Sequence, residues 1–189
     1  MESVSEDVKK IIIVEEPKKT SVKKIKCEKE KKMRVETKTW GLNKEDLSHE
    51  MQLNVLKSIQ TMQRNKYVSM FTSHIKSKIC SYKHQDILKK KLNEAQLIQF
   101  EGVIDLLNNS ELKCHYCSQE VYILYEKVRE MKQWSLDRID NNIGHNVGNL
   151  VIACLECNLK RRRTNKDAFM FTKNMVIVKE DYIQTDINH

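Results

Sequence analysis

Glycine, proline and long apolar runs are scarce in this sequence. Its 189 residues include four Gly and one Pro, whereas an all-β sandwich or barrel needs many tight turns, so that class is excluded. No apolar run approaches the roughly 20 residues that a membrane-spanning helix requires. A secretory signal peptide is also lacking, and we therefore expect no membrane partner and an intracellular, reducing compartment.

Charged residues are abundant, and the two signs are unequal. Lys and Arg number 34 against 26 Asp and Glu, which gives a formal net charge of +8 and a pI of about 9.1. Such a balance favours an anionic partner, and nucleic acid is the commonest one. It argues against a structural protein that only joins protein partners.

Composition and motif position divide the chain into four parts. Residues 1–38 are rich in Lys and Glu and contain no aromatic residue, so we predict a disordered charged tail. Residues 43–110 are expected to form a helical region and residues 111–173 a metal-bound ββα module. Residues 174–189 are expected to form a C-terminal strand or tail. The fold class is therefore α+β.

Apolar residues recur at helical spacing in the second part. We expect helices over 43–65 and about 67–80, and a third that begins near Asn93, with Gln96 completing a capping box. These apolar stripes are interpreted as core. The helical region is expected to pack against the metal module, because neither part has much core of its own.

Two C-x-x-C pairs are separated by 36 residues, and they are the most specific feature of the chain. Four thiolates suit one tetrahedral Zn²⁺ ion, and a site closed by four ligands is structural rather than catalytic. The predicted zinc ligands are Cys114, Cys117, Cys154 and Cys157.

The segments around these pairs indicate strands and a helix. Alternation predicts strands over 121–125, 135–140 and 150–153, and the stretch 156–171 reads as one helix. A further strand is expected within 175–182. The zinc ion would hold the start of the helix against the strand that carries Asp137, so that Asp137 and Asn158 share a second, harder cation.

The pattern D-R-I-D-N-x-x-G-H-x-x-x-N-L-x-I-x-C-x-x-C-N-x-x-R, which starts at Asp137, resembles the HNH endonucleases. The resemblance is to the zinc-stapled branch with a ββα-metal (His-Me finger) module, similar to HNH proteins of phages and large DNA viruses. It covers roughly residues 112–172. If the protein is viral, it implies a location in the host cytoplasm or nucleus.

The resemblance implies roles for particular residues. The four cysteines correspond to the structural zinc ligands. Asp137 and Asn158 correspond to the ligands of a catalytic Mg²⁺ or Mn²⁺, and Asn149 corresponds to the residue that orients the loop and the base. The implied activity is hydrolysis of DNA phosphodiester bonds, as an endonuclease or nickase. RNA is not excluded as a substrate, and two copies could pair to cut both strands.

Arg138 stands where the family has its general base, a His directly after the Asp. Arginine cannot accept a proton at neutral pH, so two hypotheses stay open. In the first, another group activates the water, with His145 and Asp140 as candidates, while Arg138 clamps the phosphate. In the second, the module has lost cleavage and is a zinc-stapled nucleic-acid-binding protein.

A run of four cations follows Asn158 on the predicted helix. Four successive residues cover nearly a full helical turn, so at least two should face a docked ligand. We predict phosphate contacts from this run; the alternative is a solvated basic patch that also serves as a nuclear-import signal. The residues are Lys160, Arg161, Arg162 and Arg163.

Overall fold

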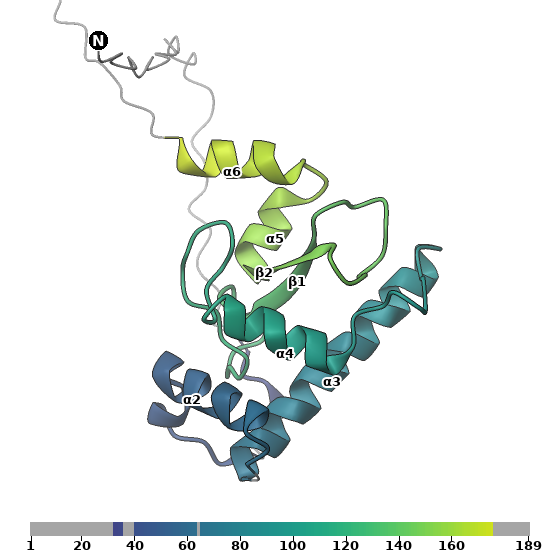
Figure 1. The fold of residues 1–189 in the computed structure, drawn as a ribbon. Helices are drawn as coiled ribbons and strands as arrows, with labels where there is room; N and C mark the ends of the chain where they lie inside the picture. The colour runs from purple at the N-terminus through teal and green to yellow at the C-terminus, as the bar shows by residue number, and fades with distance from the viewer. Residues whose placement is uncertain (1–31, 36–39, 64, 176–189) are drawn as a thin grey trace, which may run out of the picture. The chain divides into compact units, whose positions relative to one another are not determined.

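A two-stranded antiparallel sheet lies between helices in this computed structural model, which describes residues 32–35, 40–63 and 65–175 (Figure 1). The class is α+β, as predicted. The elements are η1 (Glu45–Leu47), α2 (His49–Gln60), α3 (Lys66–Leu88), α4 (Phe100–Asn109), β1 (Trp134–Arg138), β2 (Leu150–Cys154), α5 (Leu155–Arg161) and α6 (Lys166–Asn174).

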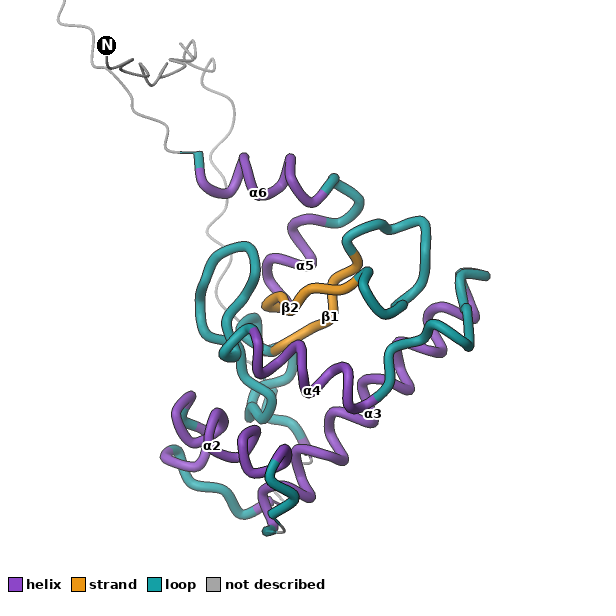
Figure 2. The backbone as a smooth tube through the Cα atoms, viewed as in Figure 1, coloured by secondary structure: helices purple, strands orange, loops and turns teal. Residues whose placement is uncertain are grey.

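The sheet is formed by the two strands predicted on either side of the G-H turn. Strand β1 pairs with β2 in a register that runs from Trp134 opposite Cys154 to Arg138 opposite Leu150. Figure 2 shows the long loop that joins the two strands. Helix α5 follows β2 directly and packs against both strands, so the order strand, loop, strand, helix is confirmed.

The helices before the sheet differ from the prediction mainly at their ends. Helix α2 begins after Ser48, whose hydroxyl accepts a hydrogen bond from the Met51 amide, so the predicted start at Asn43 is wrong. Helix α3 is longer than expected. Asn93 and Gln96 do contact each other, but the chain only turns there and α4 begins at Phe100.

The single helix expected over 156–171 is wrong, because the chain forms two helices there. At Arg162, α5 ends with a backbone φ of 51°, a left-handed conformation that an α-helix cannot continue. Asn165 then starts α6 by accepting hydrogen bonds from the amides of Asp167 and Ala168.

The strand expected over 121–125 is also wrong. Val121, Ile123 and Leu124 are buried, yet their segment forms no named strand. Tyr122 forms an isolated parallel bridge with Gln133, and the next two residues bond to Gln52 on α2. The Gln52 side-chain oxygen accepts from the amides of Ile123 and Leu124, and its nitrogen donates to the carbonyl oxygens of Leu47 and Leu124. For Ile123 and Leu124, a buried side-chain amide therefore takes the place of a partner strand.

One hydrophobic core joins the helical region to the cysteine-containing module. It runs from Val55 and Leu56 on α2, through Ile104 on α4, to Trp134 on β1 and Phe169 on α6. Among the described residues, no helix has both the length and the apolar character needed to cross a bilayer.

The predicted terminal segments lie largely outside the described residues. This applies to the tail over 1–31 and to the C-terminal strand beyond Met175. Residues 32–35, which the tail prediction included, are instead paired with the chain near Lys127. The Arg34 amide donates to the Glu126 carbonyl and the Val128 amide donates to the Lys32 carbonyl.

We predict that Gln52→Leu lowers the free energy of unfolding by roughly 3 kcal/mol or more. The change removes four hydrogen bonds. It leaves buried backbone groups without hydrogen-bond partners, each at a cost of about 1–3 kcal/mol. Urea denaturation followed by circular dichroism measures the effect. Gln60→Leu, at the exposed end of the same helix, is the matched control and should change stability by less than about 0.5 kcal/mol. Equal effects of the two substitutions would contradict the role of Gln52.

Candidate metal centre and catalytic site

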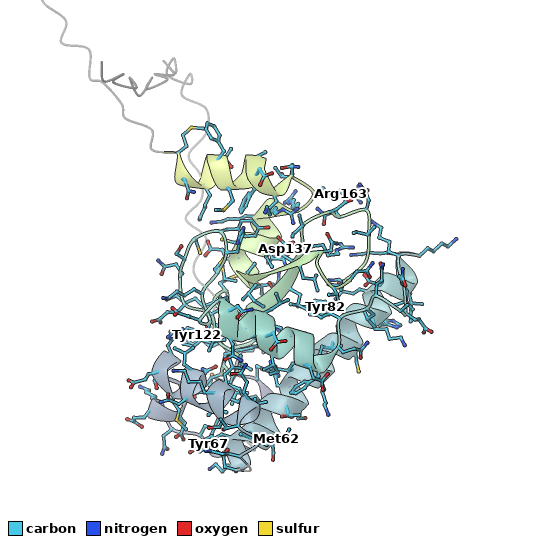
Figure 3. The ribbon with its side chains drawn as sticks, in the orientation of Figure 1. Met62, Tyr67, Tyr82, Tyr122, Asp137 and Arg163 are labelled. Atoms are coloured by element: carbon cyan, nitrogen blue, oxygen red, sulfur yellow. The ribbon has the colours of Figure 1, made fainter. Side chains whose placement is uncertain are left out.

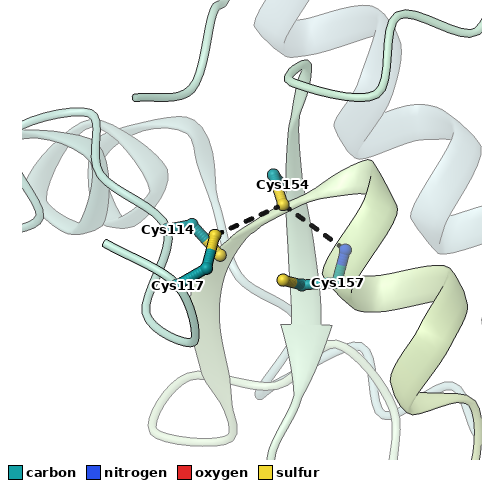
Figure 4. A group of neighbouring side chains, drawn as sticks. All are labelled: Cys114, Cys117, Cys154 and Cys157. Carbon is teal, nitrogen blue, oxygen red and sulfur yellow. Dashed lines mark hydrogen bonds between the residues drawn. The ribbon is translucent and has the colours of Figure 1, made fainter. Parts of the chain in front are cut away.

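Four cysteine thiols converge at the point where β2 passes into α5. The sulfur atoms of Cys114, Cys117, Cys154 and Cys157 all lie within 4.8 Å of one another, and Figure 4 shows them facing a common centre. The predicted set is therefore brought together. The cluster offers four soft sulfur donors, so it can hold a metal ion such as Zn²⁺.

The local chain geometry positions these thiols. Cys154 is the N-cap of α5, and its sulfur accepts a hydrogen bond from the Cys157 amide at 3.4 Å. Cys114 and Cys117 lie in a turn that is closed by a hydrogen bond from the Cys114 amide to the Gln119 carbonyl. A helix start and a tight turn thus each present two sulfurs.

The thiols differ in acidity. The pKa of Cys114 falls to about 4, because the Cys154 thiol and nearby backbone amides donate hydrogen bonds to it. Burial raises the pKa of Cys157 to about 12. Metal binding would release the remaining thiol protons, so occupancy of the cluster should depend on pH.

Asp137 is buried and accepts two hydrogen bonds on one oxygen. Its Oδ2 accepts from the Tyr116 hydroxyl at 2.7 Å and from Nη1 of Arg161 at 2.8 Å. Among the described residues, no group donates to Oδ1. The Tyr116 pKa is raised, first by burial and then by this carboxylate.

Asn158 lies on α5, on the same side of the sheet as Asp137. Its Nδ2 donates to the Ser135 hydroxyl and to the Leu136 carbonyl. These two contacts fix the amide orientation and leave the side-chain oxygen without a partner among the described residues. The predicted ligands therefore each retain one free oxygen.

His145 is held by a residue from a different part of the chain, Asp86 on α3. The His145 Nδ1 lies 2.9 Å from Asp86 Oδ1, and the His145 backbone amide donates to Asp86 Oδ2 at 2.6 Å. The ring also stacks on Tyr82, with centroids 4.5 Å apart. Burial lowers the pKa of His145, and the nearby charges of Arg138 and Lys89 lower it further, against the opposing effect of Asp86.

Two cations, Arg138 and Lys89, lie near His145. Arg138 Nη1 lies 4.0 Å from Asp86 and donates to the Ile143 carbonyl. Lys89, at the end of α3, has a pKa lowered by burial and then by Arg138, Lys91 and Arg163. Four cations therefore form one basic cluster, which is defined as Lys89 and Lys91 after α3, Arg138 at the end of β1 and Arg163 after the end of α5.

Asn149 closes the loop that carries His145. Its Oδ1 accepts from the Asp140 amide, and its Nδ2 donates to the carbonyls of Asp140 and Gly144. The side chain of Asp140 is engaged locally, since its Oδ1 accepts from the Asn142 amide. Gly144 has no room for a side chain, because a Cβ there would lie 2.6 Å from the Lys91 carbonyl oxygen.

The four cations from Lys160 to Arg163 have different surroundings. Lys160 pairs with Glu156 one turn earlier. Arg161 is 1% exposed, and its guanidinium bonds to Asp137 and to the carbonyls of Arg138 and Ile139, so it is not available to a phosphate in this structure. Arg162 and Arg163 are exposed, and Arg163 belongs to the basic cluster.

The candidate residues of β1 lie on two faces of the sheet. Side chains alternate along a strand; accordingly, Asp137 faces α5, whereas Arg138 contacts Asp86 of α3. Figure 3 shows Asp137 on the sheet, Tyr82 on α3 and Arg163 after α5. The predicted cation ligands and the predicted base therefore approach the end of β1 from opposite sides.

Sequence reasoning missed Asp86 and the structural role of Tyr116. Asp86 had a signal that went unused. The stripe on α3 formed by Phe71, Ile75, Ile79 and Tyr82 reaches Asp86 at the next helical position, so a carboxylate occupies a core position. A buried carboxylate requires donors, and its burial would have indicated a partner elsewhere.

We predict that Cys154→Ser removes the bound metal and unfolds the surrounding module. Zinc ligation in such clusters contributes about 10 kcal/mol or more of folding free energy. Elemental analysis should give one zinc per chain before the change and none after it. Cys80→Ser, at an exposed thiol of α3 outside the cluster, is the matched control. A native, zinc-free Cys154→Ser protein would show that the cluster is not a structural metal site.

Comparison with known proteins yields no family assignment. No family model matches the chain, and neither a curated protein nor a solved structure matches it. The function is therefore inferred from the residues of this chain and their geometry.

Proposed function

We propose that the protein is a metal-dependent HNH-type endonuclease or nickase that hydrolyses DNA phosphodiester bonds. The observation that carries the proposal is the environment of His145. Its ring is oriented by Asp86, its Nε2 has no partner among the described residues, and Arg138 and Lys89 lie close enough to influence its charge. A neutral imidazole beside fixed cations suits a general base for attack on a phosphate.

The oxygens of Asp137 and Asn158 fit a hard divalent cation. Each residue offers one free oxygen, and Mg²⁺ or Mn²⁺ needs few protein ligands, because water and phosphate oxygens complete the coordination shell. The ligands and His145 approach the end of β1 from opposite sides, so a phosphate bound at that end of the strand would contact both. There the ion would neutralise charge on the phosphate and assist the leaving oxygen. The soft, closed cluster of four thiols has a structural role.

The chain's own residues supply the remaining chemistry. His145 Nε2 accepts a proton from a water molecule, the water oxygen bonds to phosphorus, and the bond from phosphorus to the leaving oxygen breaks with its electron pair. Arg138 and Lys89 bind the non-bridging oxygens and stabilise their growing charge. Asn149 keeps the His145 loop closed by its three hydrogen bonds.

The second candidate is a zinc-stapled nucleic-acid-binding module without cleavage. The buried ion pair between Asp137 and Arg161 favours it. A guanidinium on one oxygen of the carboxylate reduces the negative charge available to a divalent cation, which weakens binding at the neighbouring oxygen. The basic cluster would serve DNA or RNA equally well in this case.

We predict that the zinc-loaded protein nicks supercoiled plasmid when Mg²⁺ or Mn²⁺ is added and that His145→Ala slows nicking by about 100-fold or more, because the proton acceptor is lost. His84→Ala, at an exposed histidine of α3, is the matched control and should retain the full rate. Asp137→Asn should also abolish nicking, while its amide oxygen still accepts hydrogen bonds from Tyr116 and Arg161.

The assay separates the two candidates. Plasmid left intact with every metal, together with retained binding of a fluorescent duplex, would establish the binding module and exclude the nuclease. Cleavage of RNA but not DNA would reassign the substrate. Unchanged nicking by His145→Ala would remove the role of His145, and Asp140→Asn would then be compared.

We predict that the nicking rate is flat around pH 7 and falls only below about pH 6.5, the usual pKa of histidine. The lowered pKa keeps Nε2 neutral to lower pH, and protonation below that pKa removes the base. Asp86 opposes this shift, whereas Arg138 and Lys89 reinforce it. Initial rates at constant ionic strength from about pH 5 to 8 test the sign. A rate that falls at a pH well above 6.5 would contradict it.

A further inference from the structure

We infer that Asp86 is a positioning residue that holds His145 as the tautomer protonated at Nδ1, with Nε2 left as the open acceptor. This inference rests on the proposed function for its catalytic meaning. The assignment of the tautomer, however, depends only on the contacts between the two residues and can be measured without any cleavage.

Two contacts from one carboxylate fix both the backbone and the ring of His145. Oδ2 accepts from the backbone amide at 2.6 Å, and Oδ1 lies 2.9 Å from Nδ1. An ionised carboxylate only accepts hydrogen bonds, so Nδ1 must carry the proton. In a neutral imidazole the other nitrogen then has the lone pair.

The surroundings leave the ring little freedom to turn. Asp86 is fully buried and His145 is 3% exposed. Tyr82 stacks on the imidazole with an interplanar angle of 29°. At Gly144 a Cβ would lie 2.8 Å from Asp86 Oδ2. Any residue other than glycine would therefore keep the backbone farther from the carboxylate.

Arg138, a member of the basic cluster, lies beside the contact between Asp86 and His145. Arg138 Nη1 is 4.0 Å from the Asp86 oxygen that contacts Nδ1, and the charges of Arg138 and Lys89 both act on His145. A phosphate bound by these cations would therefore lie near the His145 ring, whose Nε2 can accept a proton. Asp86 does not touch the substrate; it acts through His145.

Asp86→Asn tests the inference on the full, zinc-loaded chain. The asparagine oxygen can replace Oδ2 as acceptor for the His145 amide. Its NH₂ group then points at Nδ1 and donates, which forces the proton to Nε2. Asp105→Asn, at an exposed aspartate of α4 without a hydrogen bond among the described residues, is the matched control.

The readout is the ¹⁵N NMR spectrum of the His145 ring at neutral pH, assigned by comparison with His145→Ala. We expect a protonated Nδ1 and an unprotonated Nε2 in the unaltered protein and the reverse in Asp86→Asn. A proton on Nε2 in the unaltered protein, or an unchanged tautomer in a folded Asp86→Asn protein, would overturn the inference. If Asp86→Asn does not fold, the spectrum of the unaltered protein alone decides.

Kinetics add a readout that a merely structural role would not move. Asp86→Asn should lower kcat for plasmid nicking by about 100-fold and leave KM and duplex binding unchanged, because the basic cluster is intact. A loss confined to KM would overturn the positioning role. If the unaltered protein does not nick DNA, the proposed nuclease function fails, and the tautomer measurement still decides the role of Asp86.

Discussion

Convergence of four thiols at the end of β2 is the constraint on which the sheet and its helix depend. The sheet has only two strands, and α5 has only seven residues, lengths that are marginal on their own. The cluster ties the turn before β1 to the junction of β2 with α5. Tyr116, between the first two cysteines, then donates to Asp137 on β1, so the cysteine-containing turn also reaches the interior of the sheet.

Buried charge is arranged in two separate sets around β1. On one face Asp137 accepts hydrogen bonds from Arg161 and Tyr116, and on the other Asp86 accepts them from His145 and has Arg138 nearby. Each carboxylate thus has donors, which is the condition for burying it without a large desolvation penalty. The first set connects α5 to the sheet, and the second connects α3 to the loop between the strands.

The parts of the fold that local pattern determines could be predicted, and the parts that long-range contacts determine could not. The cysteine spacing and the alternation around Asp137 identified the thiol cluster and both strands. The segment over 121–125 looked like a strand, because the sequence does not show that Gln52 binds the backbone of Ile123 and Leu124. The break at Arg162 was missed, since the residue has no turn signature; the burial of Arg161 depends on Asp137, which lies 24 residues earlier.

The contact between Asp86 and His145 has a consequence for how the protein can be divided. The two residues are 59 positions apart, and the cysteines, both strands and His145 all lie within 111–173. A gene fusion that carried only this segment would transfer the complete thiol cluster without the Asp86 carboxylate. The smallest portable unit therefore includes α3, and shuffling of such segments between proteins would have to move the helix together with the sheet.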